Sequence, residues 1–157
     1  MKKKAILEKD YYPIVSSWLQ KTYKCFKVKE NVGIENSRAD VVGVKDIGGD
    51  FSGEIETIII EVKRGTEAFA TAAGQAYGYT IYGNKVYLAD VKPAGFSEDE
   101  LQIASHLGIG LIQITESLRV KEVLSSPYYR PLSKFNIKFL HKLHLVKCQI
   151  CQNHFDA

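Results

Sequence analysis

The stretch ETIIIEVKRG, residues 56–65, sets the interpretation of the whole chain. It belongs to a run, 54–64, that is apolar on both faces for most of its length, which predicts a buried strand in the centre of a sheet. Yet a carboxylate, Glu61, and an ammonium group, Lys63, follow at its end. A buried charge is costly unless it has a partner, a metal ion or water. Both side chains are therefore expected to have such partners.

The rest of the chain predicts a mixed α/β sheet with helices on its faces. A helical stripe over 6–21 contains Pro13, which kinks or restarts that helix. The helix after the central strand is expected to begin at an N-cap, Thr66, and to end at Gly83 and Asn84. The other predicted strands are 23–32, 39–45, 85–91 and 111–115, and the predicted helices after the first are 66–82, 97–107 and 118–124.

Composition and charge limit the class of protein. The chain has 157 residues, 45% of them hydrophobic, which suits one domain over 1–126 and a short basic appendage with Cys and His residues over 127–157. It contains no apolar run long enough for a membrane span and no secretory signal, so we expect a cytoplasmic protein. The uneven net charge of +3 fits a polyanionic partner such as nucleic acid, although lysines that serve only solubility explain it equally well.

A second carboxylate is expected beside Glu61. Strand periodicity places Glu61 and Lys63 on one face, about 6.6 Å apart along the strand. If 39–45 and 56–63 form an antiparallel hairpin, a symmetric register pairs residues whose numbers sum to about 101, which sets Asp40 opposite Glu61. A shift of one residue would move Asp40 to the other face of the sheet.

This pair of carboxylates points to metal chemistry. Two facing acidic groups repel one another, but oxygen ligands are what Mg²⁺ or Mn²⁺ requires, so Asp40 and Glu61 could share one such ion. Lys63 could orient or deprotonate a metal-bound water, or stabilise charge that develops on a phosphate. A nucleophilic water, a Lewis acid and a cation in one patch are the requirements for phosphodiester hydrolysis.

The following helix carries a second signal, GQAYGY at 74–79. Gln75 and Tyr79 are four residues apart and share a helical face, from which they could contact a substrate phosphate or support Lys63. Close packing of a small-residue helix on the sheet, with Gln75 hydrogen-bonded locally, explains the same pattern.

With these residues the chain resembles the PD-(D/E)xK nuclease superfamily, which has the restriction-endonuclease-like fold. It is similar to the branch of RecB-type nucleases, Holliday-junction resolvases and Mrr-like restriction enzymes. The resemblance rests on Asp40 in SRADVVGV, Glu61 and Lys63 in IIIEVKRG, and Gln75 with Tyr79 in GQAYGY. It covers 5–91, where the order of elements also looks like the family's α-β-β-β-α-β core. A proline that often precedes the family's aspartate is absent here.

The resemblance implies metal-dependent cleavage of DNA. Asp40, Glu61 and the main-chain carbonyl of Val62 would bind Mg²⁺ or Mn²⁺, and Lys63 would activate the water. Family members often have a further glutamate on the first helix near the metal. The candidates for that position are, in order, Glu8 and Asp10.

Two arginines near this cluster are candidates for substrate binding. Arg38 and Arg64 could each bind a DNA phosphate. A surface contact between Arg38 and Glu35 is an equally simple explanation for the first. The whole cluster also has a plain alternative, a surface ion pair of Glu61 with Lys63 or Arg64 at a strand end.

The C-terminal segment offers a different kind of site. Cys148 and Cys151 have the spacing of a zinc knuckle, and His144 or His154 could add ligands for Zn²⁺. The alternative is a basic tail that is disordered or bound to a partner. Zinc shared between two subunits is a third arrangement.

The sequence therefore predicts a Mg²⁺-dependent deoxyribonuclease that acts in restriction, repair or junction processing. One metal site cuts one strand at a time, so cleavage of a duplex or junction would suggest a homodimer. Two alternatives remain open. One is a nucleic-acid-binding module of the same fold that does not cut, and the other is a zinc-dependent interaction protein that acts through its tail.

Overall fold

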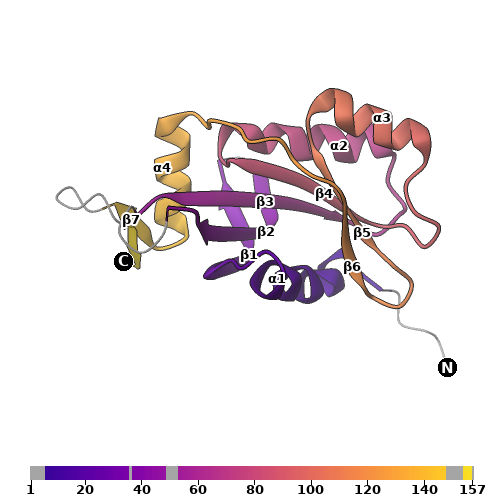
Figure 1. Ribbon diagram of the computed structural model, residues 1–157, viewed down its shortest axis with the longest axis horizontal. Coiled ribbons are helices and arrows are strands. Elements are labelled where there is room, and N and C mark those ends of the chain that lie inside the picture. The colour runs from indigo at the N-terminus through magenta and orange to yellow at the C-terminus, as the bar shows by residue number, and fades with distance from the viewer. Residues whose placement is uncertain (1–5, 36, 49–52, 148–153, 157) are drawn as a thin grey trace.

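A six-stranded mixed sheet with helices on both faces forms the centre of the computed structural model, which describes residues 6–35, 37–48, 53–147 and 154–156 (Figure 1). The sheet contains, in spatial order, β1 (Lys27–Ile34), β2 (Ser37–Asp46), β3 (Ile55–Lys63), β4 (Lys85–Val91), β5 (Gly110–Ile114) and β6 (Val120–Leu124). The helices are α1 (Tyr12–Lys21), α2 (Phe69–Gly78), α3 (Glu98–Leu107) and α4 (Ser133–Lys142), with short 3₁₀ turns η1 (Glu8–Tyr11) and η2 (Tyr79–Ile81). The predicted mixed α/β class is confirmed.

Strand β3 lies inside the sheet, antiparallel to β2 and parallel to β4. Its residues 56–63 are all buried, as expected for a central strand. The β2–β3 register pairs Val41 with Ile60 and Asp46 with Ile55, which confirms the predicted register. The pair Val41–Ile60 lies one step before Asp40 and Glu61.

Two apolar layers fix β3 from opposite faces. On one face, Val15 and Leu19 of α1 pack in a buried cluster with Ile58 and Ile60. On the other face, α2 contributes the small side chains of Ala72, Ala73 and Ala76 to a cluster that contains Ile59. Because all three isoleucines are fully buried, the end of β3 is held by a close-packed scaffold.

The C-terminal part of the chain also packs on the sheet. Phe139, Leu140 and Leu143, from α4 and its end, belong to the same buried cluster as Ile59. The boundary that we expected after residue 126 therefore does not coincide with a break in the core. Beyond α4, β7 (Leu145–Lys147) and β8 (His154–Asp156) pair antiparallel in a separate two-stranded sheet. No helix in the described ranges is both long and apolar enough to cross a membrane.

Two predicted elements differ from the structure. We expected 118–124 to be a short helix, but residues 120–124 form β6, antiparallel to β5. Half-buried and exposed side chains alternate along β6, which is the period of a strand, and the edge of β5 supplies its hydrogen-bond partners. The helix expected from Thr66 begins at Phe69, with Ala68 at the N-cap position. The Thr66 hydroxyl instead lies 3.2 Å from Nε of Arg64, from which it accepts a hydrogen bond.

Two other boundaries are shifted. The first strand begins at Lys27 instead of residue 23 and continues to Ile34, so the turn before β2 is shorter than the predicted 33–38. Pro13 lies in the first turn of α1, directly after η1. Of the two outcomes expected at this proline, a kink or a restart of the helix, the structure has the restart.

Candidate functional site

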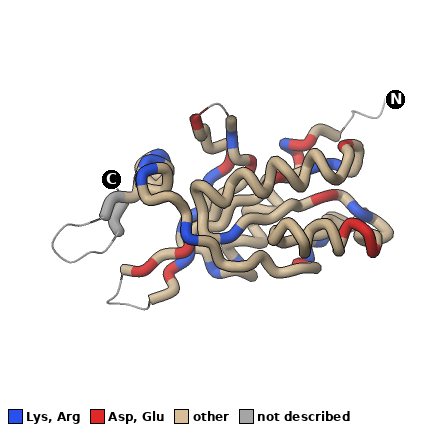
Figure 2. The backbone as a smooth tube through the Cα atoms, turned by 90° about the horizontal axis from the view of Figure 1, so that it is seen from above, with Lys and Arg blue, Asp and Glu red and all other residues tan. Residues whose placement is uncertain are grey.

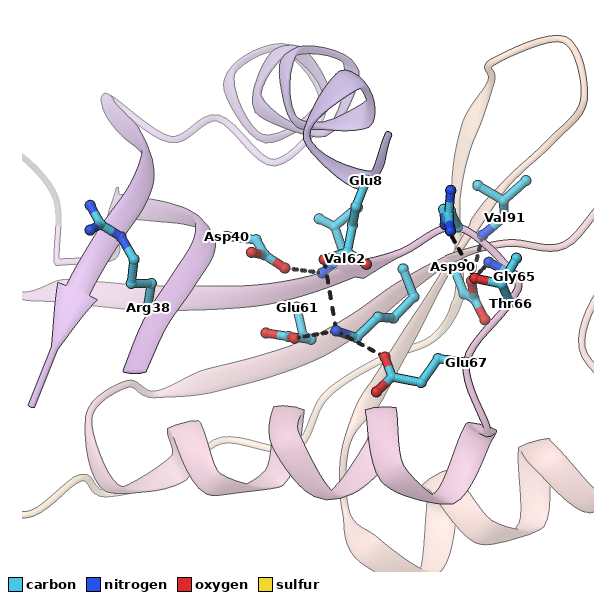
Figure 3. A network of polar contacts seen from close by, with 12 residues as sticks. Glu8, Arg38, Asp40, Glu61, Val62, Gly65, Thr66, Glu67, Asp90 and Val91 are labelled. Carbon is cyan, nitrogen blue, oxygen red and sulfur yellow. Dashed lines mark hydrogen bonds and ion pairs between the residues drawn. The ribbon is translucent and has the colours of Figure 1, made fainter. Parts of the chain in front are cut away.

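The site lies where β2 and β3 separate. Beyond the pair Val41–Ile60, the main-chain N–H of Val62 donates a hydrogen bond to Oδ2 of Asp40, at 2.8 Å (Figure 3). The other oxygen, Oδ1, accepts a hydrogen bond from the hydroxyl of Tyr12 on α1. Both oxygens of the buried Asp40 carboxylate are thus oriented by the scaffold.

Lys63 lies at the centre of four carboxyl groups, those of Glu8, Asp40, Glu61 and Glu67, which we call the carboxylate cluster. Its Nζ is 2.8 Å from Oε1 of Glu61 and 3.0 Å from Oε2 of Glu67, and Oε1 of Glu8 lies 3.8 Å away (Figure 3). The Glu61 and Lys63 side chains are only 7% and 9% exposed, so this is not the surface ion pair considered as the plain alternative. Glu8 and Glu67 are about one-third exposed and form the outer side of the cluster.

Tyr79 orients Glu61 from the face of the sheet on which α2 packs. Its hydroxyl donates to Oε2 of Glu61 at 2.5 Å, and the same hydroxyl lies 3.0 Å from the main-chain carbonyl oxygen of Arg38. Tyr79 is buried but also lines a hollow beside Glu61, and its direct contact with a substrate phosphate stays a prediction. Tyr79 begins η2, and its hydroxyl lies against the Glu61 carboxylate.

The charges in the cluster are unequal. Burial raises the pKa of both Asp40 and Glu61, and the negative charge of Asp40 raises that of Glu61 further. Burial alone would lower the pKa of Lys63, but hydrogen bonds to Glu61 and Glu67, together with the negative charges of Glu61 and Glu8, outweigh it and raise the pKa. Lys63 therefore stays protonated at neutral pH. The cluster contains more carboxyl groups than positive charges, which favours an added cation.

The donor groups at this position are all oxygens. Asp40 and Glu61 supply carboxylates, and the carbonyl of Val62 faces the same gap as its N–H, because both groups of a strand residue point toward one neighbour. This set fits a hard cation such as Mg²⁺ or Mn²⁺. Within the described ranges, however, no group of three or more His, Cys, Asp or Glu side chains is arranged to hold a metal ion. The fit therefore depends on the main-chain carbonyl and on water.

Gln75 and Arg38 lie beside this cluster and not in it. Together with Glu61 they line an open hollow of about 500 Å³ between the start of β2 and α2, which we call the Glu61 hollow. Arg38 donates to Oδ1 of Asn31 at 2.6 Å and to the carbonyl of Asn31 at 3.0 Å. The alternative contact between Arg38 and Glu35 is therefore wrong, and Glu35 pairs with Lys138 at 3.6 Å instead.

Two other candidates have structural partners. Arg64 donates to the Thr66 hydroxyl and, at 3.3 Å, to the carbonyl of Ile6, so it connects the turn after β3 to the N-terminal segment. Its guanidinium is exposed, and its binding of phosphate stays a prediction. Asp10, the second choice for the first helix, accepts a hydrogen bond from the N–H of Leu7 at 2.7 Å and lies outside the cluster.

Three residues of the site were not identified from the sequence. Tyr12 reaches Asp40 because α1 packs against the sheet, and Glu67 reaches Lys63 across the turn between β3 and α2. The third is Asp90, which is 2% exposed and paired in register with Lys63. Its Oδ1 accepts hydrogen bonds from the N–H groups of Gly65 at 2.7 Å and Val91 at 2.9 Å, which fixes the turn that follows Lys63 (Figure 3). An aspartate at the end of the apolar run VYLAD was the available signal.

The candidate zinc ligands lie largely outside the described residues. This holds for Cys148, Cys151 and the side chain of His154. His144 is exposed and follows α4, and zinc binding by these residues stays a prediction. Cys25, the cysteine of the described ranges, is buried as a free thiol.

Comparison with known proteins shows the fold but not the activity. No family model matches the chain, and no match was found among curated proteins. Among solved structures, the SPO1766 protein of unknown function from Silicibacter pomeroyi is similar, with a TM-score of 0.61. The two chains share 18% sequence identity, and the match covers 89% of this chain and 86% of that one. At this identity the likeness shows a common fold alone.

Proposed function

We propose that the protein is a metal-dependent deoxyribonuclease of the PD-(D/E)xK type, which hydrolyses phosphodiester bonds of DNA. The observation that carries the proposal is the convergence of Asp40, Glu61 and Lys63 where β2 and β3 separate, with all three side chains buried and oriented. The element order α1, β1, β2, β3, α2, β4 supports it, because it is the order of that family's core.

Asp40, Glu61 and the carbonyl of Val62 are the groups that would hold Mg²⁺ or Mn²⁺. When bound, such an ion supplies a Lewis acid and lowers the pKa of a coordinated water. Tyr12 and Tyr79 each hold one carboxylate in place, so the ligands are oriented before a cation arrives.

Lys63 contributes positive charge. Its contacts with Glu61 and Glu67 raise its pKa in the metal-free protein, and its expected role in activating the water stays a prediction. Its ammonium group is suited to stabilise the negative charge that develops on the phosphate during attack. Glu8, whose pKa is raised by burial and which lies 3.8 Å from Lys63, is a second candidate to accept the proton of the water.

Positive charge away from the cluster supports a polyanionic substrate. Lys134, Lys138 and Lys142 are spaced four residues apart along α4 and therefore share one face of that helix (Figure 2). Acidic residues gather elsewhere, at the start of α3. Cleavage of a duplex would require two copies of the chain, one for each strand.

A cleavage assay tests the proposal directly. Linear, nicked and four-way DNA are incubated with Mg²⁺, Mn²⁺ or EDTA, and we expect cleavage that needs the metal and is lost in Asp40→Asn and Lys63→Met. The matched control is Asp99→Asn, which changes an exposed aspartate on α3. Metal-independent cleavage, or full activity of the Asp40 and Lys63 variants, would refute the assignment.

One observation favours a second candidate, a DNA-binding module that does not cut. Both oxygens of Glu61 already have partners, Lys63 and Tyr79, so a cation must compete with Lys63 for Oε1. Binding of DNA with the same affinity in EDTA and in Mg²⁺, with no cleavage in either, would select this function.

A further inference from the structure

The Glu61 hollow is large enough for a ligand group and opens directly beside the proposed cleavage site. Its volume of about 500 Å³ lies within the range of small-ligand sites. Glu61, which belongs to the carboxylate cluster, also lines this hollow. Oε1 of Glu61 contacts Lys63, and Oε2 accepts a hydrogen bond from Tyr79, which also lines the hollow. A group in the hollow would thus be the immediate neighbour of a phosphate at the cluster.

The charges of the hollow do not favour a phosphate inside it. Its ionisable lining consists of the carboxylates Glu35 and Glu61 and one cation, Arg38. The guanidinium of Arg38 is already engaged by Asn31 through Nε and one terminal nitrogen. Glu61 and Glu35 are paired with Lys63 and Lys138, so the hollow has no excess of positive charge to attract an anion. A neutral group with N–H donors would find carboxylate and amide acceptors.

The other lining residues fit a nucleobase. Tyr82 is half-buried, with its ring packed against Phe135 and Phe139, and contributes aromatic surface to the lining, to which Ile34 and Ile81 add apolar surface. Gln75 is exposed on the rim and has an amide that can both donate and accept. Stacking on an aromatic ring, with amide and carboxylate groups at the base edge, is how proteins bind unpaired bases.

Two glycines of α2 face the hollow. Gly74 and Gly78 both line the hollow, and a Cβ atom added to either would meet no atom within 4 Å. A glycine inside a helix is locally unfavourable, so the helix gains nothing from them by propensity. Their effect is to keep open the room in front of Gln75 and Tyr82.

We propose that the Glu61 hollow binds one unpaired nucleobase of the strand that is cut, next to the scissile phosphate. A base that is stacked and paired in a duplex cannot enter it, so the substrate is DNA with single-stranded character at the cleavage point. The assignment of this base to the strand that is cut rests on the proposed nuclease function, but base binding itself can be measured without cleavage.

The path beyond the hollow is basic. Glu35 on its rim forms an ion pair with Lys138 of α4, and Lys134 and Lys142 lie on the same face of that helix. A strand whose base occupies the hollow would place its next phosphates toward these lysines, where non-specific phosphate contacts supply affinity.

Binding in EDTA separates this inference from the nuclease activity. Fluorescence anisotropy compares a short single-stranded oligonucleotide with a hairpin duplex of the same length. A single 2-aminopurine in the strand reports stacking of a base. The test variant is Gly74→Phe, which fills the hollow, and the matched control is Ala70→Phe, which adds the same ring at an exposed position of α2 outside it. Circular dichroism checks that both variants are folded.

We expect the wild type to bind the single strand more tightly than the duplex. Gly74→Phe should lower the affinity for the single strand about tenfold, which corresponds to the contribution of one stacked base, and should change the affinity for the duplex little. Ala70→Phe should keep the wild-type preference. If the wild type binds both DNA forms equally and Gly74→Phe changes neither, the inference is overturned, even where Asp40-dependent cleavage persists. If no metal supports cleavage but Gly74→Phe selectively weakens single-strand binding, the nuclease proposal fails and the base-binding hollow stands.

Discussion

The main-chain N–H of Val62 donates a 2.8 Å hydrogen bond to Oδ2 of Asp40 at the point where β2 and β3 separate. In a continuous ladder, a main-chain carbonyl of β2 would accept this bond. Here a carboxylate takes that position, so negative charge is placed beside β3 while the buried N–H keeps a partner. Charge and backbone pairing can therefore be tested separately at residue 40.

Asp40→Asn keeps an oxygen acceptor for Val62 and removes the charge. Because burial raises the pKa of Asp40, the charged form is disfavoured in the folded protein, and we expect the free energy of unfolding to change by less than about 1 kcal/mol. Asp40→Ala leaves the N–H without its acceptor and should lower that free energy by about 1–3 kcal/mol. Urea unfolding measures both values. Equal losses in the two variants would show that the hydrogen bond is not what stabilises this position.

Lys63→Met should destabilise the metal-free protein. Removal of one partner from a buried ion pair leaves uncompensated carboxylates at Glu61 and Glu67, at a cost of about 3 kcal/mol. The matched control is Lys138→Met, because the Lys138–Glu35 pair is exposed and should contribute less than about 1 kcal/mol. Thermal unfolding with and without Mg²⁺ checks this. The ion should stabilise Lys63→Met more than the wild type, and an equal shift for both would argue against a cation site at Glu61.

The metal-free protein should lose stability as the pH rises from acidic to neutral. Burial raises the pKa of Asp40, Glu61 and Asp90, so each binds a proton more tightly in the folded state than in the unfolded state. Such groups stabilise the fold below their unfolded pKa and lose that contribution as the pH rises through the raised values. Lys63 does not contribute to the pH dependence of stability between acidic and neutral pH, because its raised pKa lies above this range. Urea unfolding at several pH values measures the slope, and Mg²⁺ should reduce it.

Gly65→Ala should weaken both stability and cleavage. Gly65 has φ +81°, and an added Cβ would lie 2.7 Å from the carbonyl oxygen of Val91, so the turn after Lys63 must shift. We expect a loss of about 2 kcal/mol in the free energy of unfolding. Gly95→Ala is the matched control, since Gly95 has φ +85° but open space around it. That variant should lose about 1 kcal/mol and keep its activity. Cleavage at the wild-type rate by Gly65→Ala would mean that this turn does not position Lys63.

The sequence was sufficient for the centre of the sheet. The apolar residues 58–60 and 62 favour a buried strand, and the short connection from β2 makes a local hairpin whose register follows from symmetry. The relation of Asp40 to β3 follows from that register. Local pattern and chain connectivity thus determine the part of the site that lies on β2 and β3.

Contacts made by packing could not be obtained in this way. Tyr12 reaches Asp40 from a helix on one face, and Glu67 reaches Lys63 from the turn before α2, and neither contact leaves a sequence period. The wrong prediction of a helix at β6 has the same origin. A five-residue segment with mixed polarity becomes a strand only when the edge of β5 is available.

The hairpin of β2 and β3 also has a consequence for the order of folding. Its two strands pair through a short local connection, whereas the parallel pairing of β3 with β4 must wait for α2 to cross over between them. Contacts of low sequence separation close a smaller loop and therefore form at lower entropic cost. We expect the hairpin to belong to the folding nucleus, so that Asp40 and Glu61 are brought together early, before the second half of the chain folds.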